Sequence, residues 1–334
     1  MKNERLTQRQ LLALLWAGLL APAVEVPPVD AGPGTWLSTL IALPVLAAVL
    51  VLWRGGELPK LLAALYGLWG VVLLAVRLRL CAQRLLGAGW RDGSMAFFLL
   101  GTAALALWIG MGHRAAFGRL GQCALTILLV TAAGVLALAV PKVELGRVFP
   151  LWTQDVAPAL RAGGAAAGML GWGVFAGFLY GHVDPETRKP GRALWWAAWG
   201  CGLLSAGQFI VLGCFGPRLS AQLTNPFFNL AKSVGVTGAF QRVESVVAAL
   251  WMFSDLIQLG VLLYALREIG GRIFPGKEKQ AAAAGLVLAA AGGLALVPVE
   301  MEPVVLAGNL VFGAGIPVVF GLLKKSPKKL EKRC

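Results

Sequence analysis

Residues 238–264 of the chain read GAFQRVESVVAALWMFSDLIQLGVLLY. The stretch is long and apolar enough to cross a bilayer, which takes about 20 mostly apolar residues in a helix. It nevertheless carries two acids, Glu244 near its start and Asp255 further in, followed by the amide Gln258. At a rise of 1.5 Å per residue, Asp255 would lie about 16 Å deeper than Glu244, close to mid-membrane. A charged aspartate there costs at least about 2.5–3.5 kcal/mol, so its side chain is expected to face a bundle interior or a wet cavity.

Six residues of this stretch, among them both acids and Gln258, share one face of the predicted helix. Their spacing alternates between four and three residues, which is the spacing of a single helical stripe. The stripe consists of Glu244, Ala248, Trp251, Asp255, Gln258 and Leu262. Two interpretations of Asp255 remain open at this point. It is either a protonated or hydrogen-bonded structural group, or part of the wall of a binding site, because intramembrane acids are usually functional.

The whole chain has the same apolar character as this stretch. Of its 334 residues, 58% are hydrophobic and only 14% are charged, with a mean hydropathy of +0.74. Soluble domains are about a quarter charged, so the composition excludes a soluble protein and predicts an all-α integral membrane protein in contact with the lipid bilayer. The net charge of +14 does not indicate a nucleic-acid partner, because the Lys and Arg residues mostly lie between apolar runs.

The sequence predicts a single transmembrane domain of about ten helices over residues 1–334. The predicted spans are 9–27, 36–53, 59–83, 94–112, 120–140, 162–183, 193–215, 243–266, 280–298 and 303–323, separated by segments that carry Pro, Gly and charge. About two thirds of the 30 Lys and Arg residues lie on segments that are inside if the N-terminus is cytoplasmic. This bias predicts that both termini are cytoplasmic. The basic residues expected outside gather near the end of the third span, at Arg77, Arg79, Arg84 and Arg91.

The first span also resembles a signal peptide, because three basic residues precede it and a small-x-small site follows at residues 21–23. Its apolar run continues to Pro27, which favours a retained helix.

Helices one and six carry features of interrupted membrane helices. Pro22 removes a backbone donor from helix one and frees the carbonyl of Gly18, and the glycine-rich residues 161–183 predict a break at Gly171–Gly173. Each feature also has a simpler interpretation as a kink or as close helix packing. In two five-helix halves, however, helices one and six occupy matching positions, and matched breaks point to a binding site.

No enzyme motif is found in the sequence. HExxH, GxSxG and paired-carboxylate patterns are absent, and the loop GRIFPGKE at 271–278 has Glu278 where a P-loop needs Ser or Thr. Neither His113 and His182 nor the five cysteines are spaced as metal ligands. We therefore expect no catalytic residue, no metal and no cofactor.

The stretch NPFFNLAKSVGVTGAFQRVESVVAALWMFSDL, residues 225–256, resembles the spore germinant receptor B-subunit family. Members of that family carry a Phe-x-Arg-x-Glu element, which Phe240, Arg242 and Glu244 match here. The segments LTQRQLLALLWAGLLAPAVEVPP, GTWLSTLIALP and VFPLWTQDVAPALRAG look like the corresponding parts of the family as well. The resemblance therefore spans nearly the whole chain.

The resemblance implies the amino acid–polyamine–organocation superfamily and a LeuT-like five-plus-five inverted repeat with broken helices one and six. Repeat one would cover about 9–140, repeat two about 162–298, helix ten 303–323 and a basic cytoplasmic tail 324–334. The resemblance also implies the endospore inner membrane, a small-molecule nutrient such as an amino acid, and germinant receptor A and C subunits as partners. Many members have an acid after the glycine of helix six, whereas Val174 follows Gly173 here.

The predicted ligand site lies between helices one and six and is walled by helices three and eight. Half-helix N-termini would bind a carboxylate through backbone N–H groups and the positive end of the helix dipole. The predicted ligand-binding residues are Ala17, Gly18 and Leu20 of helix one, Trp69 and Val72 of helix three, Gly171, Trp172 and Gly173 of helix six, and Trp251, Asp255 and Gln258 of helix eight.

Binding of the ligand would shift the population of a conformation that partner subunits read. Two other functions stay open, an amino acid or amine transporter of the same fold and a structural membrane scaffold. A scaffold would not need Asp255.

Overall fold

The computed structural model describes residues 5–25, 32–53, 58–87, 93–223, 226–234, 243–295 and 298–325. Within them the chain is almost wholly helical, apart from an isolated β-bridge between Leu6 and Val183. The predicted all-α class is therefore confirmed. Phe240, Arg242 and residues 326–334 of the basic tail lie outside the described residues.

The long helices correspond in order to the predicted spans. They are α1 (Gln8–Glu25), α2 (Ser38–Leu52), α3 (Lys60–Gly87), α4 (Met95–Met111), α5 (Arg114–Ala139), α6 (Val156–Leu170) continued by η6 (Gly171–His182), α7 (Pro190–Phe215), α10 (Val243–Ile273), α11 (Glu278–Ala295), and α12 (Pro298–Leu310) continued by η8 (Val311–Gly315) and α13 (Ile316–Lys325). Six stretches of the described residues are long and apolar enough to cross a membrane, namely Pro33–Leu52, Lys60–Gly87, Arg114–Lys142, Thr153–His182, Gly191–Phe215 and Pro303–Gly321, and α4 is a shorter apolar helix.

Short helices occupy the connections between the long ones. They are η2 (Pro33–Leu37), η3 (Val140–Lys142), η4 (Leu145–Arg147), η5 (Thr153–Asp155), η7 (Pro185–Thr187), α8 (Pro217–Gln222) and α9 (Pro226–Ser233). Gly216 has a φ of 77°, a conformation that glycine adopts without strain, and it allows the sharp turn from α7 into α8.

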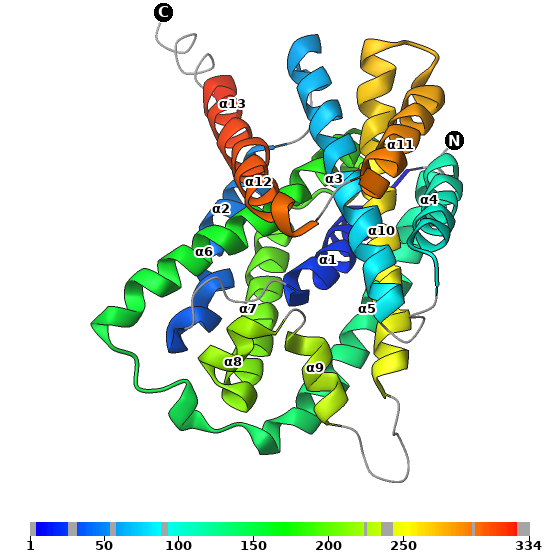
Figure 1. Cartoon of the computed structure of the whole chain (residues 1–334). Helices are drawn as coiled ribbons and strands as arrows, with labels where there is room; N and C mark the ends of the chain where they lie inside the picture. Colours follow the sequence, from blue (N-terminus) through cyan, green and yellow to red (C-terminus); the bar gives the residue numbers. More distant parts are fainter. Residues whose placement is uncertain are drawn as a thin grey trace, which may run out of the picture.

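Four elements, α1, α3, η6 and α10, form the middle of the bundle. α10 packs against α1, α3 and η6, and α1 also packs against α5. Figure 1 shows α10 running through the bundle, with α12 and α13 on one side and α8 and α9 at one end. Of the residues in the most apolar part of the stretch that contains helix six, 83% are buried inside the protein, whereas only 17% of those in the last helix are buried. Helix six is therefore enclosed by the other helices.

Helix six changes its hydrogen-bonding pattern at the predicted position. The α-helix ends at Leu170, and a 3₁₀-helix begins at Gly171 and runs to His182. A long 3₁₀ stretch within a helix often marks a hinge, because its geometry is poorer than that of an α-helix.

Helix one differs from the prediction in this respect. α1 continues as one α-helix through Gly18 and Pro22 to Glu25. Proline removes a single donor from the helical ladder, and packing against α5 and α10 supports the rest of the helix.

Candidate functional site

Helices α1, η6 and α10 meet around Gly18. A Cβ atom added there would lie 2.8 Å from Cη2 of Trp172 and 3.2 Å from Cα of Gln258. The hydroxyl of Ser254 donates a hydrogen bond of 2.5 Å to the carbonyl of Ala17. The structure thus brings together four predicted residues, Ala17, Gly18, Trp172 and Gln258, with Ser254 added. We call this set, together with the predicted Asp255, which follows Ser254 in α10, the central junction.

The side chains of α10 point in different directions at this junction. Successive residues of an α-helix are rotated by about 100°, and Ser254 points to α1 whereas Asp255 points to α3. Gln258 then projects about 40° from Ser254 and about 60° from Asp255, between the two. All three side chains are buried. Gln258 therefore faces the seam between α1 and α3.

Asp255 forms an ion pair with Arg84 in the last turn of α3. The distance from Asp255 Oδ2 to Arg84 Nη1 is 2.6 Å, and Asp255 is only 1% exposed. A small cavity beside the pair is lined by Cys81, Arg84, Leu85, Met252 and Asp255. The guanidinium neutralises the acid, and this explains how a charged group is kept within the bundle. The sequence does not predict this partner, although the unexpected basic residues at the end of the third span are a signal for it.

Several buried polar atoms of the central junction have no hydrogen-bond partner among the described residues. They are Nε1 of Trp172, Oδ1 of Asp255 and Oε1 of Gln258. Most buried polar groups in proteins are hydrogen-bonded, so each exception needs an explanation. The junction offers one N–H donor and two oxygen acceptors, which a bound molecule or water could pair.

Trp69 and Gly171 face helix ten instead of the central junction. Nε1 of Trp69 donates a hydrogen bond of 3.1 Å to Oδ1 of Asn309, and its ring stacks on Phe312 at a centroid distance of 5.5 Å. A Cβ at Gly171 would lie 2.5 Å from the carbonyl oxygen of Asn309. These two residues lie where η6, α3 and the α12–η8 region meet.

The remaining predicted residues lie around the central junction without converging on it. Leu20 is buried in the main apolar core, and Val72 packs at its edge. A Cβ at Gly173 would lie 2.8 Å from Cδ1 of Leu15. Trp251 packs against Phe227 of α9, with ring centroids 5.0 Å apart, so α9 covers the end of the bundle where α10 begins.

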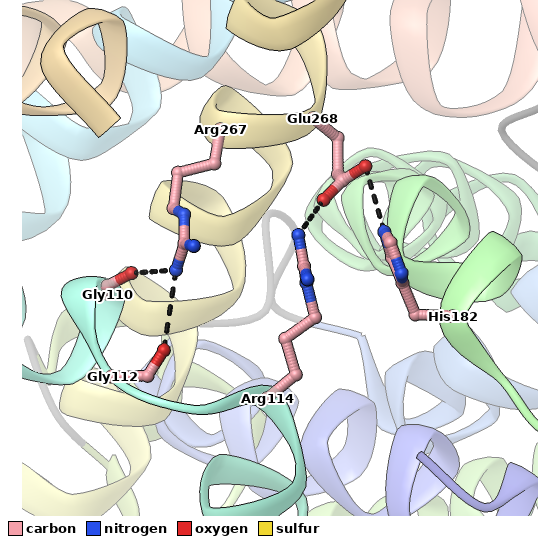
Figure 2. Close-up of polar contacts among 6 residues, drawn as sticks. All are labelled: Gly110, Gly112, Arg114, His182, Arg267 and Glu268. Atoms are coloured by element: carbon pink, nitrogen blue, oxygen red, sulfur yellow. Dashed lines mark hydrogen bonds and ion pairs between the residues drawn. The ribbon is translucent and has the colours of Figure 1, made fainter. Parts of the chain in front are cut away.

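A polar cluster closes the opposite end of the central helices (Figure 2). Oε1 of Glu268 lies 2.5 Å from Nη2 of Arg114, and Oε2 lies 2.9 Å from Nε2 of His182. We call these three residues the Glu268 cluster. They come from the start of α5, the end of η6 and the last part of α10, so the cluster joins three elements that are distant in the sequence.

Two further contacts strengthen this end of the bundle. Nη1 of Arg267 donates hydrogen bonds of 2.6 and 3.5 Å to the carbonyls of Gly110 and Gly112, at the C-terminal end of α4 (Figure 2). The N-terminal segment is tied to the same place, because the N–H of Leu6 donates to the carbonyl of His182 at 3.1 Å. The positive Arg267 also complements the negative end of the α4 dipole.

Glu268 lies beyond the predicted span 243–266. Burial raises the pKa of its carboxyl, but the hydrogen bond and charge of His182 and the charge of Arg114 outweigh burial and lower the pKa overall. Glu268 is about 15 Å along α10 from Gln258. The central junction therefore lies between two closures, α9 with Trp251 at one end and the Glu268 cluster at the other.

This arrangement suits the binding of a small molecule in the bundle and its release through one end. Groups of three or more His, Cys, Asp or Glu residues that could hold a metal ion are not found in the described part of the chain. Glu244 and Ala248, which the sequence places on one stripe with Asp255, have no described side-chain positions.

The fold is similar to that of a known membrane transporter. Mhp1, a nucleobase-cation-symport-1 family transporter in a closed conformation with bromovinylhydantoin bound, matches 94% of this chain and 78% of its own with a TM-score of 0.63 and 16% identity. This match confirms the predicted LeuT-like fold class. No curated protein matches the sequence.

The model of the spore germination protein family matches residues 60–297, which is well over half of the chain. With its apolar helices the chain is an integral membrane protein. The chain therefore belongs to the spore germination protein family.

Proposed function

We propose that the protein is a nutrient receptor subunit of the endospore inner membrane, which binds a small molecule at the central junction and signals germination. Both termini would be cytoplasmic, and A and C subunits would be its partners. The family membership and the transporter-like fold support this class of function. An amino acid is the first candidate ligand on the basis of the family resemblance.

The observation that carries the proposal is the set of buried, unpartnered polar atoms on Trp172, Asp255 and Gln258. Their helices are the ones that the sequence predicts for the site, namely helices six and eight. Binding sites combine mostly apolar walls with a few polar groups that fix the orientation of the ligand. The surroundings of the junction, with Leu15 and Leu20 buried nearby, fit that description.

The protein would signal if the bound ligand favours one conformation of the bundle over another, for example a conformation in which the end with α9 or the end with the Glu268 cluster is open. A ligand shifts such an equilibrium only by its difference in affinity for the two states. η6 links both regions, because Trp172 lies at the central junction and His182 lies in the Glu268 cluster. Movement of η6 against α1 and α10 would then change the surface that the A and C subunits contact.

The test is a germination dose–response curve for spores that carry Trp172→Leu. We expect a nutrient response that is lost or shifted at least tenfold to higher concentration, with the protein still present on a membrane immunoblot. Trp108→Leu is the matched control, because Trp108 is 78% exposed on α4. A normal curve for Trp172→Leu would contradict binding at the central junction.

A transporter of the same fold is the second candidate function, and the match to Mhp1, itself a transporter, is the observation that favours it. Uptake of the germinating nutrient into proteoliposomes that contain the purified chain would support transport. Adjacent genes for A and C subunits, with no uptake, would support the receptor.

A further inference from the structure

We infer that the ligand of the central junction carries no charged group and is recognised by hydrogen bonds in both directions, as a carboxamide or a ring amide is. The inference rests on the proposed function and names the chemical class of its small molecule. It sets aside the amino acid that the family resemblance suggests, because the junction would bind an amide-type group and not a charged amine or carboxylate.

The charge at the junction is already balanced within the protein. Asp255 is 1% exposed and its Oδ2 lies 2.6 Å from Arg84. A cationic ligand would have to compete with the guanidinium for this carboxylate, and an anionic ligand would have to displace the carboxylate from Arg84. The next described charged residue along α10 is Arg267, about 18 Å from Asp255. A buried charge without a counter-charge is costly, so the junction disfavours charged ligands of either sign.

The backbone supplies no alternative site for a carboxylate here. α1 is continuous across Gly18, and helix six passes from α6 into η6 at Gly171 without a gap. An anion is bound at a helix terminus only where several backbone N–H groups are free. η6 begins at Gly171 as a continuation of α6, and the N–H of Gly171 already donates to the carbonyl of Gly168, so the described residues of the junction include no free helix N-terminus.

An amide-type group matches the polar atoms that remain. Its carbonyl would accept a hydrogen bond from Nε1–H of Trp172, and its N–H would donate to Oε1 of Gln258 or to Oδ1 of Asp255, which all lack partners in the described part of the chain. The amide of Gln258 is complementary to another amide in either orientation of its own O and N atoms.

The experiment uses the full chain in lipid nanodiscs and three ligands on one carbon skeleton, benzamide, benzoate and benzylamine, with L-alanine as a zwitterion. Thermal unfolding is measured at rising ligand concentration. We expect benzamide alone to raise the melting temperature. Gln258→Leu should increase the apparent Kd for benzamide at least tenfold, whereas the control Gln154→Leu, at an exposed position in η5, should leave it unchanged.

A second variant keeps the test decisive if Gln258→Leu does not fold. Gln258→Glu adds an acid that Arg84 does not already neutralise. Benzylamine should therefore raise the melting temperature of this variant, and benzamide should no longer do so. Stabilisation of the natural chain by L-alanine, benzoate or benzylamine but not by benzamide would overturn the inference and leave the proposed function standing. If no ligand has any effect and Trp172→Leu spores germinate normally, both are wrong.

Discussion

Arg84 reaches Asp255 because α3 continues to Gly87, beyond the predicted end of the span at residue 83. The carboxylate is then 1% exposed and its partner 16% exposed. The alternatives left open by the sequence, a protonated structural acid or a site wall, did not include an ion pair within the protein. The pair is non-local, and nothing in the spacing of helix eight identifies an arginine at the end of helix three as its partner.

Removal of one partner of this pair should destabilise the folded protein far more than removal of both partners. Arg84→Met leaves the carboxylate of Asp255 buried without its counter-charge, at a cost of about 3–5 kcal/mol. The double variant Arg84→Met with Asp255→Leu should recover most of that loss, because apolar side chains can replace a buried ion pair. Thermal unfolding of the purified variants measures both effects.

The exposed pair of Glu144 and Arg147 supplies the control. Glu144→Gln should cost no more than about 1 kcal/mol, as is usual for surface ion pairs. If Arg84→Met is as stable as Glu144→Gln, the buried pair does not stabilise the bundle.

At the scale of elements, helix six approaches helix ten through backbone contacts. A Cβ at Gly171 would lie 2.5 Å from the carbonyl oxygen of Asn309, and one at Gly313 would lie 2.3 Å from the carbonyl oxygen of Gly171. Close packing was one of the two readings of the glycine-rich helix, and the structure shows it on this side. The density of glycines predicted close packing, but it could not identify the partner, because helix ten is far away in the sequence.

Two glycines of helix six should therefore differ in their tolerance of alanine. Gly171→Ala forces a methyl group onto the backbone of helix ten, and we expect a loss of about 1–3 kcal/mol. Gly164→Ala should be neutral or stabilising by up to about 1 kcal/mol, because no atom lies within 4 Å of its added Cβ. Melting temperatures of both variants in detergent test this prediction. Equal values would show that helix ten can move away from an added methyl group with little loss of stability.

At the scale of the whole molecule, the number and order of the helices could be predicted because the bilayer thickness fixes how long an apolar span must be. The length and hydropathy of the spans also place Trp172 and Gln258 on the helices that meet at Gly18. Hydropathy does not predict the Glu268 cluster, because Arg114, His182 and Glu268 lie at three different helix ends. Such contacts depend on how the helix ends are arranged in space. The hydropathy of each segment contains no information about that arrangement.

The Glu268 cluster lies where η6, α5 and the end of α10 would have to separate for a path to open from that end to the central junction. Its two interactions hold one carboxylate between Arg114 and His182. Glu268→Gln removes the negative charge and keeps the size of the side chain. The variant should therefore populate an open end more often, without loss of the fold.

A single cysteine can report this opening. In a variant without the natural cysteines, Ser254→Cys places a thiol at the central junction, where Ser254 is fully buried. An impermeant methanethiosulfonate reagent should modify it several times faster in Glu268→Gln than in the parent. Glu278→Gln, at a half-buried position at the start of α11, should leave the rate unchanged, and equal rates in all three proteins would rule out a gating role for the cluster.

The effect of pH on this rate follows from the charge of Glu268. Its pKa is lowered in the folded protein from an ordinary value of about 4.3, so the contribution of the carboxylate is fully present above that value. It is lost as the pH falls through the lower pKa of the folded state. Both rates fall as the pH falls, because the thiolate is the reacting form of the cysteine. The ratio of the Glu268→Gln rate to the parent rate should nevertheless stay above one from neutral pH down to about pH 5. It should approach one below about pH 4, because protonation makes Glu268 as uncharged as the glutamine that replaces it. A ratio that persists unchanged at about pH 3 would mean that the size or hydrogen bonding of the side chain, and not its charge, holds this end of the bundle closed.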